Sequence, residues 1–232
     1  MVRRRFFFRR LARGAGVVAL ALASVFFVLV ALYAFAPPVS TLMLARLIEG
    51  RGYERIYVRL RDIAPVAAAS VIASEDARFC SNDGVDWGAL HEALNGAEGP
   101  RRAASTITMQ TAKNLFLWPG RSVIRKGVEI GMALVLGKVW SKPRTIEIYL
   151  NIAEWGDGVF GIEAAARRHF HKHAGELNAR EAALMATALP NPIKRDPARP
   201  SPLQRRHAAE IMARVEDAPE LTACLHSSTS SH

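Results

Sequence analysis

The sequence contains only two cysteines, Cys80 and Cys224, which lie far apart along the chain. Two cysteines exclude a disulfide-rich scaffold, although they can pair outside the cytoplasm. Neither a Cys-x-x-Cys nor a His-Glu-x-x-His spacing occurs. The nearest group of metal-ligand residues, His169, His171 and His173, is typical of a solvated helix end, so no metal site is predicted.

Acidic residues are absent from the first 36 positions, which contain six arginines and no lysine. The whole chain has a net charge of +10, with 31 basic and 21 acidic residues. The part beyond residue 36 therefore carries 25 basic residues against the same 21 acidic ones. Most of the excess lies in an N-terminal arm, which argues against a basic nucleic-acid-binding face on the folded part.

Charged residues are also absent from 15–36, a run of 22 residues. A helix of this length rises about 33 Å, enough to cross the hydrocarbon core of a bilayer. The arginines before it predict that the N-terminus stays in the cytoplasm and that the rest lies outside. A cleavable signal peptide is the alternative, because Ala34-Phe35-Ala36 resembles a cleavage site, but the apolar run is long for one.

Alternating patterns typical of β-strands are scarce beyond residue 36. Residues 54–60 alternate in this way, and 144–153 fit a helix or a strand equally well. Helices are predicted at 65–73, 105–117, 123–140, 162–170, 179–189 and 203–215. We therefore expect a basic arm at 1–14, a transmembrane anchor at 15–36, one mostly α-helical domain at 37–217 and a disordered tail at 218–232.

One pattern suggests a nucleotide site. Gly156, Gly158 and Gly161 fit G-x-G-x-x-G, after a strand-like run at 148–152 and before a helix-like run at 162–170. A dinucleotide-binding domain needs several parallel strands, of which this sequence offers one or two candidates at most. A helix–loop–helix turn is therefore the favoured interpretation.

Two adjacent carboxylates, Glu75 and Asp76, end the apolar helix that begins near residue 65. The helix macrodipole is unfavourable to negative charge there, and the neighbouring carboxylates repel, which raises the proton affinity of at least one of them. Such a carboxylate is a useful general base near neutral pH. A solvated acidic helix end explains the same residues and is favoured on these two residues alone.

Basic residues dominate 99–146, where Glu129 is the only acidic residue. Arg125 and Lys126 precede it by four and three residues, so the three side chains share one helical face. A cationic surface suits a diphosphate, while an ordinary ion pair is the alternative. The basic residues of this window are Arg101, Arg102, Lys113, Arg121, Arg125, Lys126, Lys138, Lys142 and Arg144.

Polar groups gather on one stripe of the helix predicted at 105–117. Hydroxyl groups weaken a helix unless they bond elsewhere, which makes this stripe unusual for a plain surface helix. Hydroxyl, amide and ammonium groups together can hold sugar and phosphate oxygens, although a solvated face is an equal alternative. The residues are Thr106, Gln110, Lys113 and Asn114.

Taken together, these features resemble the monofunctional biosynthetic peptidoglycan transglycosylases of glycosyltransferase family 51. The resemblance covers about residues 72–192, through the stretches IASEDARFCSNDGVD, ASTITMQTAKNLFLW, RSVIRKGVEIG and VWSKPRTIEIYLNIAEWGDGVFGIEAAARRHFHKHAGELNAREAALMATALPNP. It implies a mostly α, lysozyme-like helical catalytic domain on a single N-terminal transmembrane helix.

The resemblance also implies a reaction. The family polymerises lipid II into β-1,4-linked glycan strands, releases undecaprenyl diphosphate and inverts the anomeric configuration. Glu75 matches the general base, and Glu129 matches a second catalytic glutamate at the leaving diphosphate. No cofactor is required, although a divalent cation such as Mg²⁺ or Mn²⁺ is compatible with the diphosphate. Implied substrate-binding residues are Asp76, Phe79, Ser105, Thr106, Gln110, Lys113, Asn114, Arg125 and Lys126.

The implied location is the cytoplasmic (inner) membrane, with a single pass, the N-terminus inside and the catalytic domain in the periplasm. Implied partners are lipid II, the growing glycan strand, the membrane and cell-division or elongation proteins, with no nucleic acid. Neither a Ser-x-x-Lys nor a Lys-Thr-Gly motif occurs, so we expect no transpeptidase activity.

Three positions depart from the family pattern. Asn82 stands where the family usually has histidine. Ala104 ends an alanine pair that stands where Gly-Ala or Gly-Gly usually precedes the Ser-Thr, and Met109 replaces the first of two consecutive glutamines. An amide at position 82 can still hydrogen-bond. Two other functions stay open on the residues alone, a glycan-cleaving hydrolase that uses Glu75 and a non-catalytic membrane protein that binds an anionic partner.

Overall fold

A computed structural model describes residues 2–95, 105–120 and 122–226. It divides into two compact units, Met1–Pro37 and Pro38–His232, and each is described by itself. Four residues singled out in the sequence lie outside the described part of the chain, namely Arg101, Arg102, Ala104 and Arg121.

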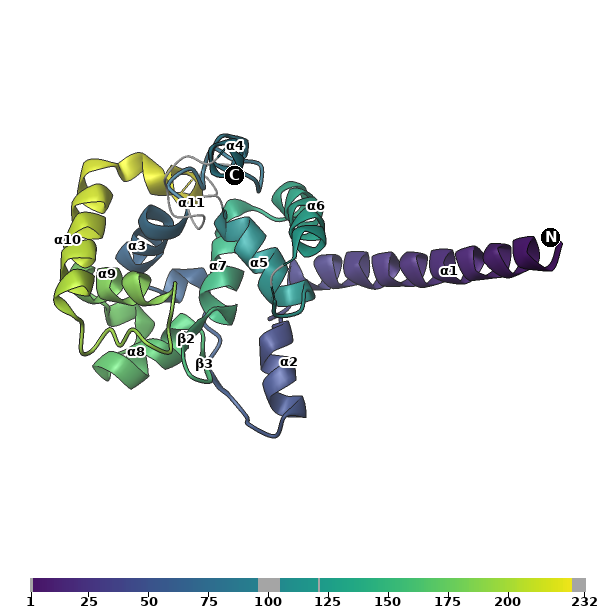
Figure 1. The fold of residues 1–232 in the computed structure, drawn as a ribbon. Helices are drawn as coiled ribbons and strands as arrows, with labels where there is room; N and C mark the ends of the chain where they lie inside the picture. Colours follow the sequence, from purple (N-terminus) through teal and green to yellow (C-terminus); the bar gives the residue numbers. More distant parts are fainter. Residues whose placement is uncertain (1, 96–104, 121, 227–232) are drawn as a thin grey trace. The chain divides into compact units, whose positions relative to one another are not determined.

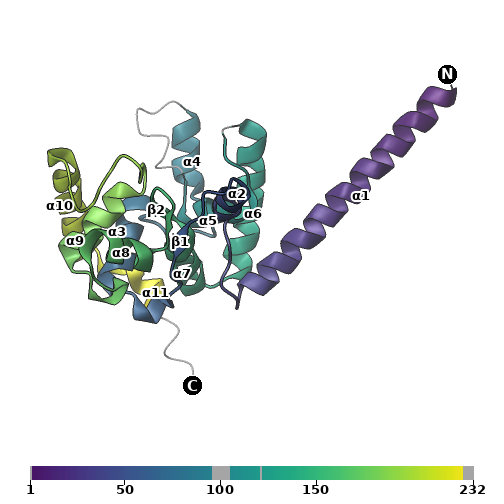
Figure 2. The ribbon, with the colours of Figure 1, turned by 90° about the horizontal axis from the view of Figure 1, so that it is seen from below.

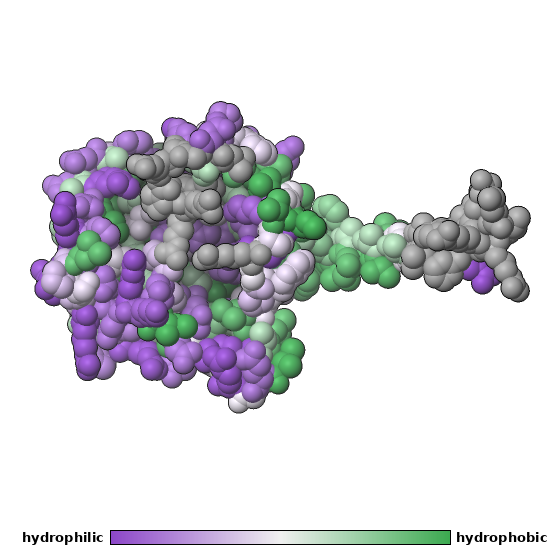
Figure 3. Space-filling model, viewed as in Figure 1, coloured by the Kyte–Doolittle hydropathy of each residue, from purple (hydrophilic) through white to green (hydrophobic). Residues whose placement is uncertain are grey.

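The first unit is one long helix, α1 (Val2–Tyr33). Its segment Arg13–Tyr33 is 21 residues long with a mean hydropathy of 2.8, which is long and apolar enough to cross a membrane. Apolar side chains such as Val17, Leu20 and Val28 are exposed, and the face seen in Figure 3 is hydrophobic along this segment. A helix that exposes apolar residues over its length is suited to lipid rather than to water.

The second unit is mostly helical, and its helices form two groups that flank α7 (Figures 1 and 2). One group packs α3 against the later helices α9 and α10. The other packs α5 against α6 and α7. The bounds are α3 Pro65–Glu75, α5 Ile107–Phe116, α6 Val123–Val139, α7 Lys142–Ile152, α8 Ile162–Phe170, α9 Ala179–Ala188 and α10 Pro202–Asp217. Each predicted helix is therefore present, with ends that differ by a few residues.

Helix α3 is the centre of the core. Proline occupies its first turn, and seven of its residues, including Val71 and Ile72, are buried. The carboxyl-terminal Glu75 and Asp76 interrupt this apolar run at the point where the helix ends. The core around α3 also contains Phe79, Leu150 and Trp155. Burial on every side explains why the helix carries so few polar residues.

A small three-stranded sheet has the order β1-β3-β2, with β1 (Glu54–Arg55) parallel to β3 (Val159–Phe160) and β2 (Glu154–Gly156) antiparallel to it. The strand predicted at 54–60 is therefore only two residues long. Beyond it, the amide of Asn151 bonds both the backbone N–H and the carbonyl of Val58, at 2.9 and 2.8 Å. A helix side chain thus replaces the neighbouring strand that the alternating pattern would need.

The glycine pattern belongs to the β2–β3 hairpin, and the strand-like run before it lies in α7. Gly158 has φ of +72°, and a Cβ there would lie 2.6 Å from the guanidinium of Arg46, which comes from α2 (Thr41–Ile48). Arg46 also lies 2.7 Å from a carboxylate oxygen of Asp157. The small residues therefore admit an arginine, and the segment is a helix–hairpin–helix connection rather than the helix–loop–helix turn expected.

The C-terminal segment differs from the prediction. Disorder was expected from residue 218, but η3 (Pro219–Thr222) and α11 (Ala223–His226) are helical, and Leu221 is buried in the core. A disulfide joins Cys224 to Cys80 across 144 residues of sequence. The prediction was wrong for 219–226 because apolar side chains such as Leu221 and Leu225 pack on the core there and a covalent link holds the segment. Residues 227–232 lie outside the described part.

Short helical segments complete the second unit. The 3₁₀ turns η1 (Leu60–Asp62) and η2 (Ala174–Glu176) flank the core, and α4 (Trp87–Leu94) follows the loop after Phe79. Asp86 caps the N-terminus of α4 by accepting a hydrogen bond from the backbone of Ala89. This cap fixes where the loop ends.

Candidate active site

Glu75 is the last residue of α3, and its carboxylate meets helix α5. The Gln110 side chain on α5 donates a hydrogen bond from Nε2 to Glu75 Oε2, at 3.1 Å. The hydroxyl of Tyr149, on α7, donates in turn to Gln110 Oε1, at 3.0 Å. The tyrosine fixes the orientation of the amide, because an amide that accepts with its oxygen must present its nitrogen to the carboxylate.

Tyr149 was not among the residues predicted for the site. Its side chain is 2% exposed, and burial beside Glu75 and Asp76 raises the pKa of its hydroxyl well above the usual value. The hydroxyl therefore stays protonated and acts as a donor. The sequence holds a weak signal at most, because a buried tyrosine needs some hydrogen-bond partner but does not reveal which.

Ser105 connects Glu75 to the second predicted catalytic glutamate. Its carbonyl oxygen lies 3.5 Å from Gln110 Nε2, and its hydroxyl accepts a 2.7 Å hydrogen bond from Lys126 Nζ. The same ammonium group donates to Glu129 Oε1, at 2.6 Å. One chain of polar contacts therefore runs from Glu75 through Gln110, Ser105 and Lys126 to Glu129, so the two glutamates share one site.

Glu129 is a buried anion held between cations. Its carboxylate is within hydrogen-bond distance of both Lys126 and Arg125, whose NH1 lies 3.1 Å from Oε2. Burial lowers the pKa of the Lys113 ammonium, and Glu129 opposes this effect. Two basic side chains therefore contact this carboxylate, whose charge also favours the protonated form of a third, Lys113. A site with this excess of positive charge has capacity for a further anion.

Helix α6 brings this arrangement about. The Ser122 hydroxyl caps the helix by accepting a hydrogen bond from the backbone of Arg125. From there, the spacing of three and four residues turns Lys126 and Arg125 toward Glu129. The predicted shared face of this helix is thus confirmed.

The rest of the basic window is dispersed. Lys142 donates to the carbonyl of Asn82, at 2.6 Å, and Arg144 bonds Tyr57 and Glu147. Lys138 is exposed at the C-terminal end of α6. Among the described basic residues of the window, Arg125 and Lys126 contact Glu129, and the charge of Glu129 also acts on Lys113. The basic residues of this window therefore have different roles, which their spacing in the sequence could not distinguish.

Asp76 supports the site through hydrogen bonds between neighbouring segments. It is 7% exposed and accepts hydrogen bonds from the backbone of Ile107, at 3.0 Å, and from the amide of Asn82. Burial raises the pKa of its carboxyl to about 6, although these hydrogen bonds and the charge of Lys142 lower it. Asp76 thereby ties the first residue of α5 to the end of α3.

Other predicted binding residues have similar supporting positions. Phe79 is fully buried in the core beneath the Lys142 ammonium, 4.6 Å from its ring centre. Thr106 caps α5 and donates to the carbonyl of Gly84, at 2.6 Å. The carbonyl of Asn114 accepts from Thr41. Phe79 therefore supports the site from the core, Thr106 both supports and lines the groove, and the contact at Asn114 involves its backbone only.

Asn82, one of the departures from the family pattern, is a hub of the loop that follows Phe79. Its amide nitrogen donates to Asp76 and to the carbonyl of Arg78, and its amide oxygen accepts from the backbone of Gly84. Lys142 contacts it as well. The expectation that an amide would hold this loop is confirmed. Met109, a second departure, is fully buried.

A groove opens beside Glu75. It is bounded by the end of α3, by Ser105 and Thr106, and by Ala89 and Glu92 of α4. Arg214 of α10 reaches its rim and donates to the carbonyl of Ala73, at 2.7 Å. This contact joins residues 141 positions apart, and no spacing in the sequence indicates it.

The residues around Glu129 do not fit a resident divalent cation. Both carboxylate oxygens already contact basic side chains, at 3.1 and 2.6 Å. Among the described residues, no three histidine, cysteine or acidic side chains are placed to hold a metal ion. His169 and His173 instead pair separately with Asp196 and Glu163. The donor set here is suited to an anion.

The chain is similar to known proteins over most of its length. A family model described as Transglycosylase matches residues 42–216. Proteins described as biosynthetic peptidoglycan transglycosylases are similar along most of their length. The one from Rhizobium meliloti is 50% identical over 196 residues, 83% of this chain and 82% of its own. The one from Rhodospirillum centenum is 50% identical over 210 residues, 89% of this chain and 91% of its own. The one from Agrobacterium fabrum is 48% identical over 224 residues, 94% of this chain and 98% of its own.

The raised pKa of Asp76 predicts how stability changes with pH. The native carboxyl, with a pKa of about 6 against 3.8 in an unperturbed state, binds more protons than the unfolded one between these values. Its contribution to the free energy of unfolding therefore falls as pH rises from about 4 to 6, by up to about 3 kcal/mol. Asp76→Asn removes this dependence. Guanidinium unfolding of both full-length proteins in detergent checks it, and parallel stability curves across this range would contradict it.

Proposed function

The chain belongs to the transglycosylase family of peptidoglycan biosynthesis, and we propose that it polymerises lipid II into β-1,4-linked glycan strands by an inverting displacement with Glu75 as general base. The observation that carries this proposal is the chain of contacts from Glu75 to the cations around Glu129. A base and an anion-binding cluster in one site are what a sugar transfer from a diphosphate donor requires.

The reaction involves one proton and two bonds. Glu75 takes the proton of the acceptor 4-hydroxyl while that oxygen attacks the anomeric carbon of the donor sugar. The bond between this carbon and the diphosphate oxygen breaks, and undecaprenyl diphosphate leaves with the electron pair. Gln110 donates to Glu75 and is itself held by Tyr149, so the carboxylate has a fixed orientation before substrate binds.

Negative charge grows on the diphosphate oxygens as this bond breaks. Lys113, Arg125 and Lys126 are placed to neutralise it, and Glu129 holds two of these cations by direct contact. Burial strengthens such interactions, because the surrounding dielectric is lower than that of water. We therefore assign leaving-group stabilisation to the protein's own cations and derive no step through a metal.

The protein is membrane-anchored by its N-terminal helix, and we propose that the enzyme domain lies on the outer side. The six N-terminal arginines favour a cytoplasmic N-terminus. The disulfide between Cys80 and Cys224 supports the same orientation, because disulfides persist outside the cytoplasm. In a cell with two membranes, this places the domain in the periplasm, where it would meet lipid II and other proteins of wall growth.

A glycan-cleaving hydrolase is the main rival reaction. It could use Glu75 as an acid or base, but its uncharged leaving group would need no cluster of three cations beside a buried glutamate. The proposal does not include transpeptidation. The described polar contacts orient a carboxylate base and provide cations for an anion, and both features fit sugar transfer. Adding finished glycan instead of lipid II to the assay distinguishes hydrolysis from polymerisation.

Glu75→Gln is predicted to abolish most polymerisation. The amide retains the shape and can still accept a hydrogen bond from Gln110, but it cannot take a proton, so the rate should fall about 10²- to 10⁴-fold. The measurement is strand formation from lipid II by the full-length protein in detergent. Glu210→Gln, which alters an exposed carboxylate on α10, is the matched control. A Glu75→Gln protein that is folded and fully active would refute the assignment.

Lys126→Met is predicted to slow turnover by weakening stabilisation of the diphosphate. The methionine keeps the apolar stem but removes the charge, and the loss of one such group costs about 10²- to 10³-fold in rate. Arg125 remains in contact with Glu129 in this variant, so the buried carboxylate keeps one cation. Lys138→Met, at the exposed end of the same helix, controls for loss of charge. Equal rates in the two variants would remove the diphosphate role.

Tyr149→Phe is predicted to reduce the rate about 5- to 30-fold, because Gln110 loses the bond that orients it toward Glu75. Tyr57→Phe is the control, since it removes a hydroxyl that bonds Glu147 away from the site. Both variants should lose stability, but only Tyr149→Phe should lose activity beyond that. Parallel changes in activity for the two variants would mean that Tyr149 acts through stability alone.

A further inference from the structure

A second hollow adjoins the groove beside Glu75. It lies over the loop between Cys80 and α4, and it is lined by Arg78, Ser81, Asp83, Asp86 and Trp87. The indole of Trp87 is 57% exposed at its rim. We propose that this hollow is a subsite for an N-acetylated amino-sugar of the glycan strand, at a distance from the reacting carbon. This inference rests on the proposed function.

The two hollows are neighbours because they share Arg78 and Asp86. The guanidinium of Arg78 and the carboxylate of Asp86 lie 3.4 Å apart, so this ion pair borders both hollows. A Cβ at Gly88 would lie 3.1 Å from Arg78 NH1 and 3.4 Å from the Asp86 oxygen. The glycine therefore leaves room for the arginine against the first turn of α4. A polymer that passes Glu75 can reach this hollow by crossing one ion pair.

The loop that carries the hollow is held firmly from within. Asn82 bonds Asp76, Gly84 and Lys142, so the backbone is tied both to the end of α3 and to the start of α7. Asp86 caps α4 immediately before Trp87. The indole thus projects from a fixed backbone position, and binding a ligand there would require little ordering of the chain.

The chemistry of the lining suits a sugar. A pyranose has an apolar face of C–H groups, which an indole can cover, and a rim of hydroxyl and amide groups, which carboxylates and a guanidinium can bond. The lining includes two carboxylates, Asp83 and Asp86, and one guanidinium, Arg78, so the hollow has no positive excess for a diphosphate or an anionic headgroup. The ligand class therefore differs from that of the cation cluster around Glu129.

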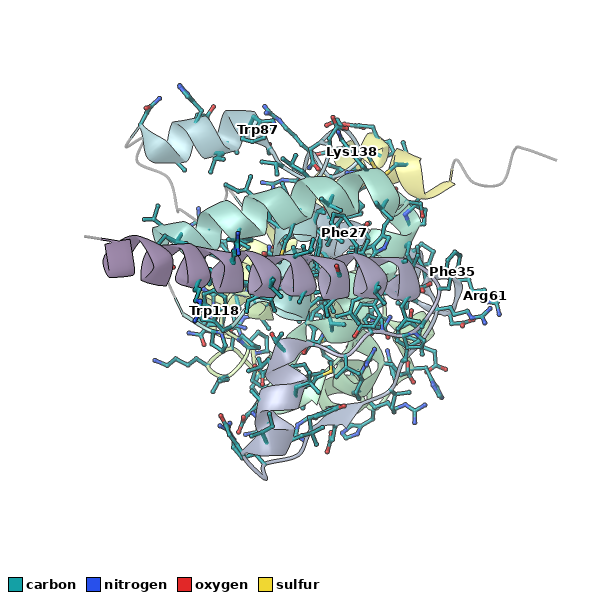
Figure 4. All side chains as sticks on the ribbon, turned by 90° about the vertical axis from the view of Figure 1, so that its right-hand side faces the viewer. Phe27, Phe35, Arg61, Trp87, Trp118 and Lys138 are labelled. Carbon is teal, nitrogen blue, oxygen red and sulfur yellow. A yellow bond between two sulfur atoms is a disulfide. The ribbon has the colours of Figure 1, made fainter. Side chains whose placement is uncertain are left out.

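Trp118 provides the contrast within the same chain. It is 60% exposed in the segment after α5, and Val123 and Ile124 close to it in sequence are also exposed. Figure 4 shows Trp87 and Trp118 on these separate elements. The remaining tryptophans of the four, Trp140 and Trp155, are buried. Trp87 lines the polar hollow and Trp118 does not, so the two exposed indoles give signals that an experiment can separate.

Intrinsic fluorescence of the full-length protein in detergent tests the site directly. Peptide-free GlcNAc–MurNAc oligosaccharides should change the tryptophan emission of the wild type and of Trp118→Phe, but not of Trp87→Phe. Brominated detergent should quench Trp118 more than Trp87. Emission that responds equally in all three proteins would overturn the proposal. A Trp87 that is quenched by the detergent and unaffected by the oligosaccharide would also overturn it, and would indicate a lipid contact instead.

The same variants distinguish sugar from peptide recognition. A response to peptide-bearing fragments alone would also overturn the proposal, since it would assign the hollow to the stem peptide. With lipid II, Trp87→Ala should raise KM and shorten the strands by about 3- to 10-fold, the equivalent of one lost aromatic contact. If the wild type makes no strands, the proposed function itself fails. If it makes strands and Trp87→Ala strands are equally long, only the subsite fails.

Discussion

The rest of the site depends on the hydrogen bonds that the buried carboxylate of Asp76 accepts. It binds the backbone of Ile107 at the start of α5 and the amide of Asn82 in the following loop. Because Asp76 directly follows Glu75, the end of α3 and the start of α5 meet at the proposed base. Its high proton affinity reflects the cost of burying a charge to obtain this junction.

A second buried carboxylate, that of Glu129, organises the cation-rich part of the site. Glu129 would be costly to bury alone, and Arg125 and Lys126 compensate it by direct contact. Lys126 also reaches Ser105, which adjoins the groove of Glu75. The same interactions that make the buried charge tolerable therefore hold cations ready beside the base. In the proposed reaction, proton removal and leaving-group stabilisation are arranged before the substrate arrives.

Several polar residues of the domain serve architecture rather than chemistry. Arg46 fills the space left by Gly158, and Asn151 bonds the chain at Val58 where a strand might have continued. The disulfide from Cys80 to Cys224 draws the C-terminal segment toward the loop that carries Asn82 and Trp87. These contacts hold the loops and short elements of the domain in place, and a rigid scaffold helps the side chains of a site to keep their geometry.

The sequence by itself determined most of the helices, the apolar N-terminal span and the local pairing of Arg125 and Lys126 with Glu129, because these depend on periodicity and on short spacings. It left α7 open, because residues 144–153 fitted a helix or a strand equally well. The sequence also carried the family resemblance, which named Glu75 and Gln110. Only the tertiary structure decided that Tyr149 orients Gln110, that Arg214 reaches the end of α3 and that the tail is anchored at Cys224. Those contacts join residues 39, 141 and 144 positions apart, and packing of the helices, rather than any local pattern, brings them together.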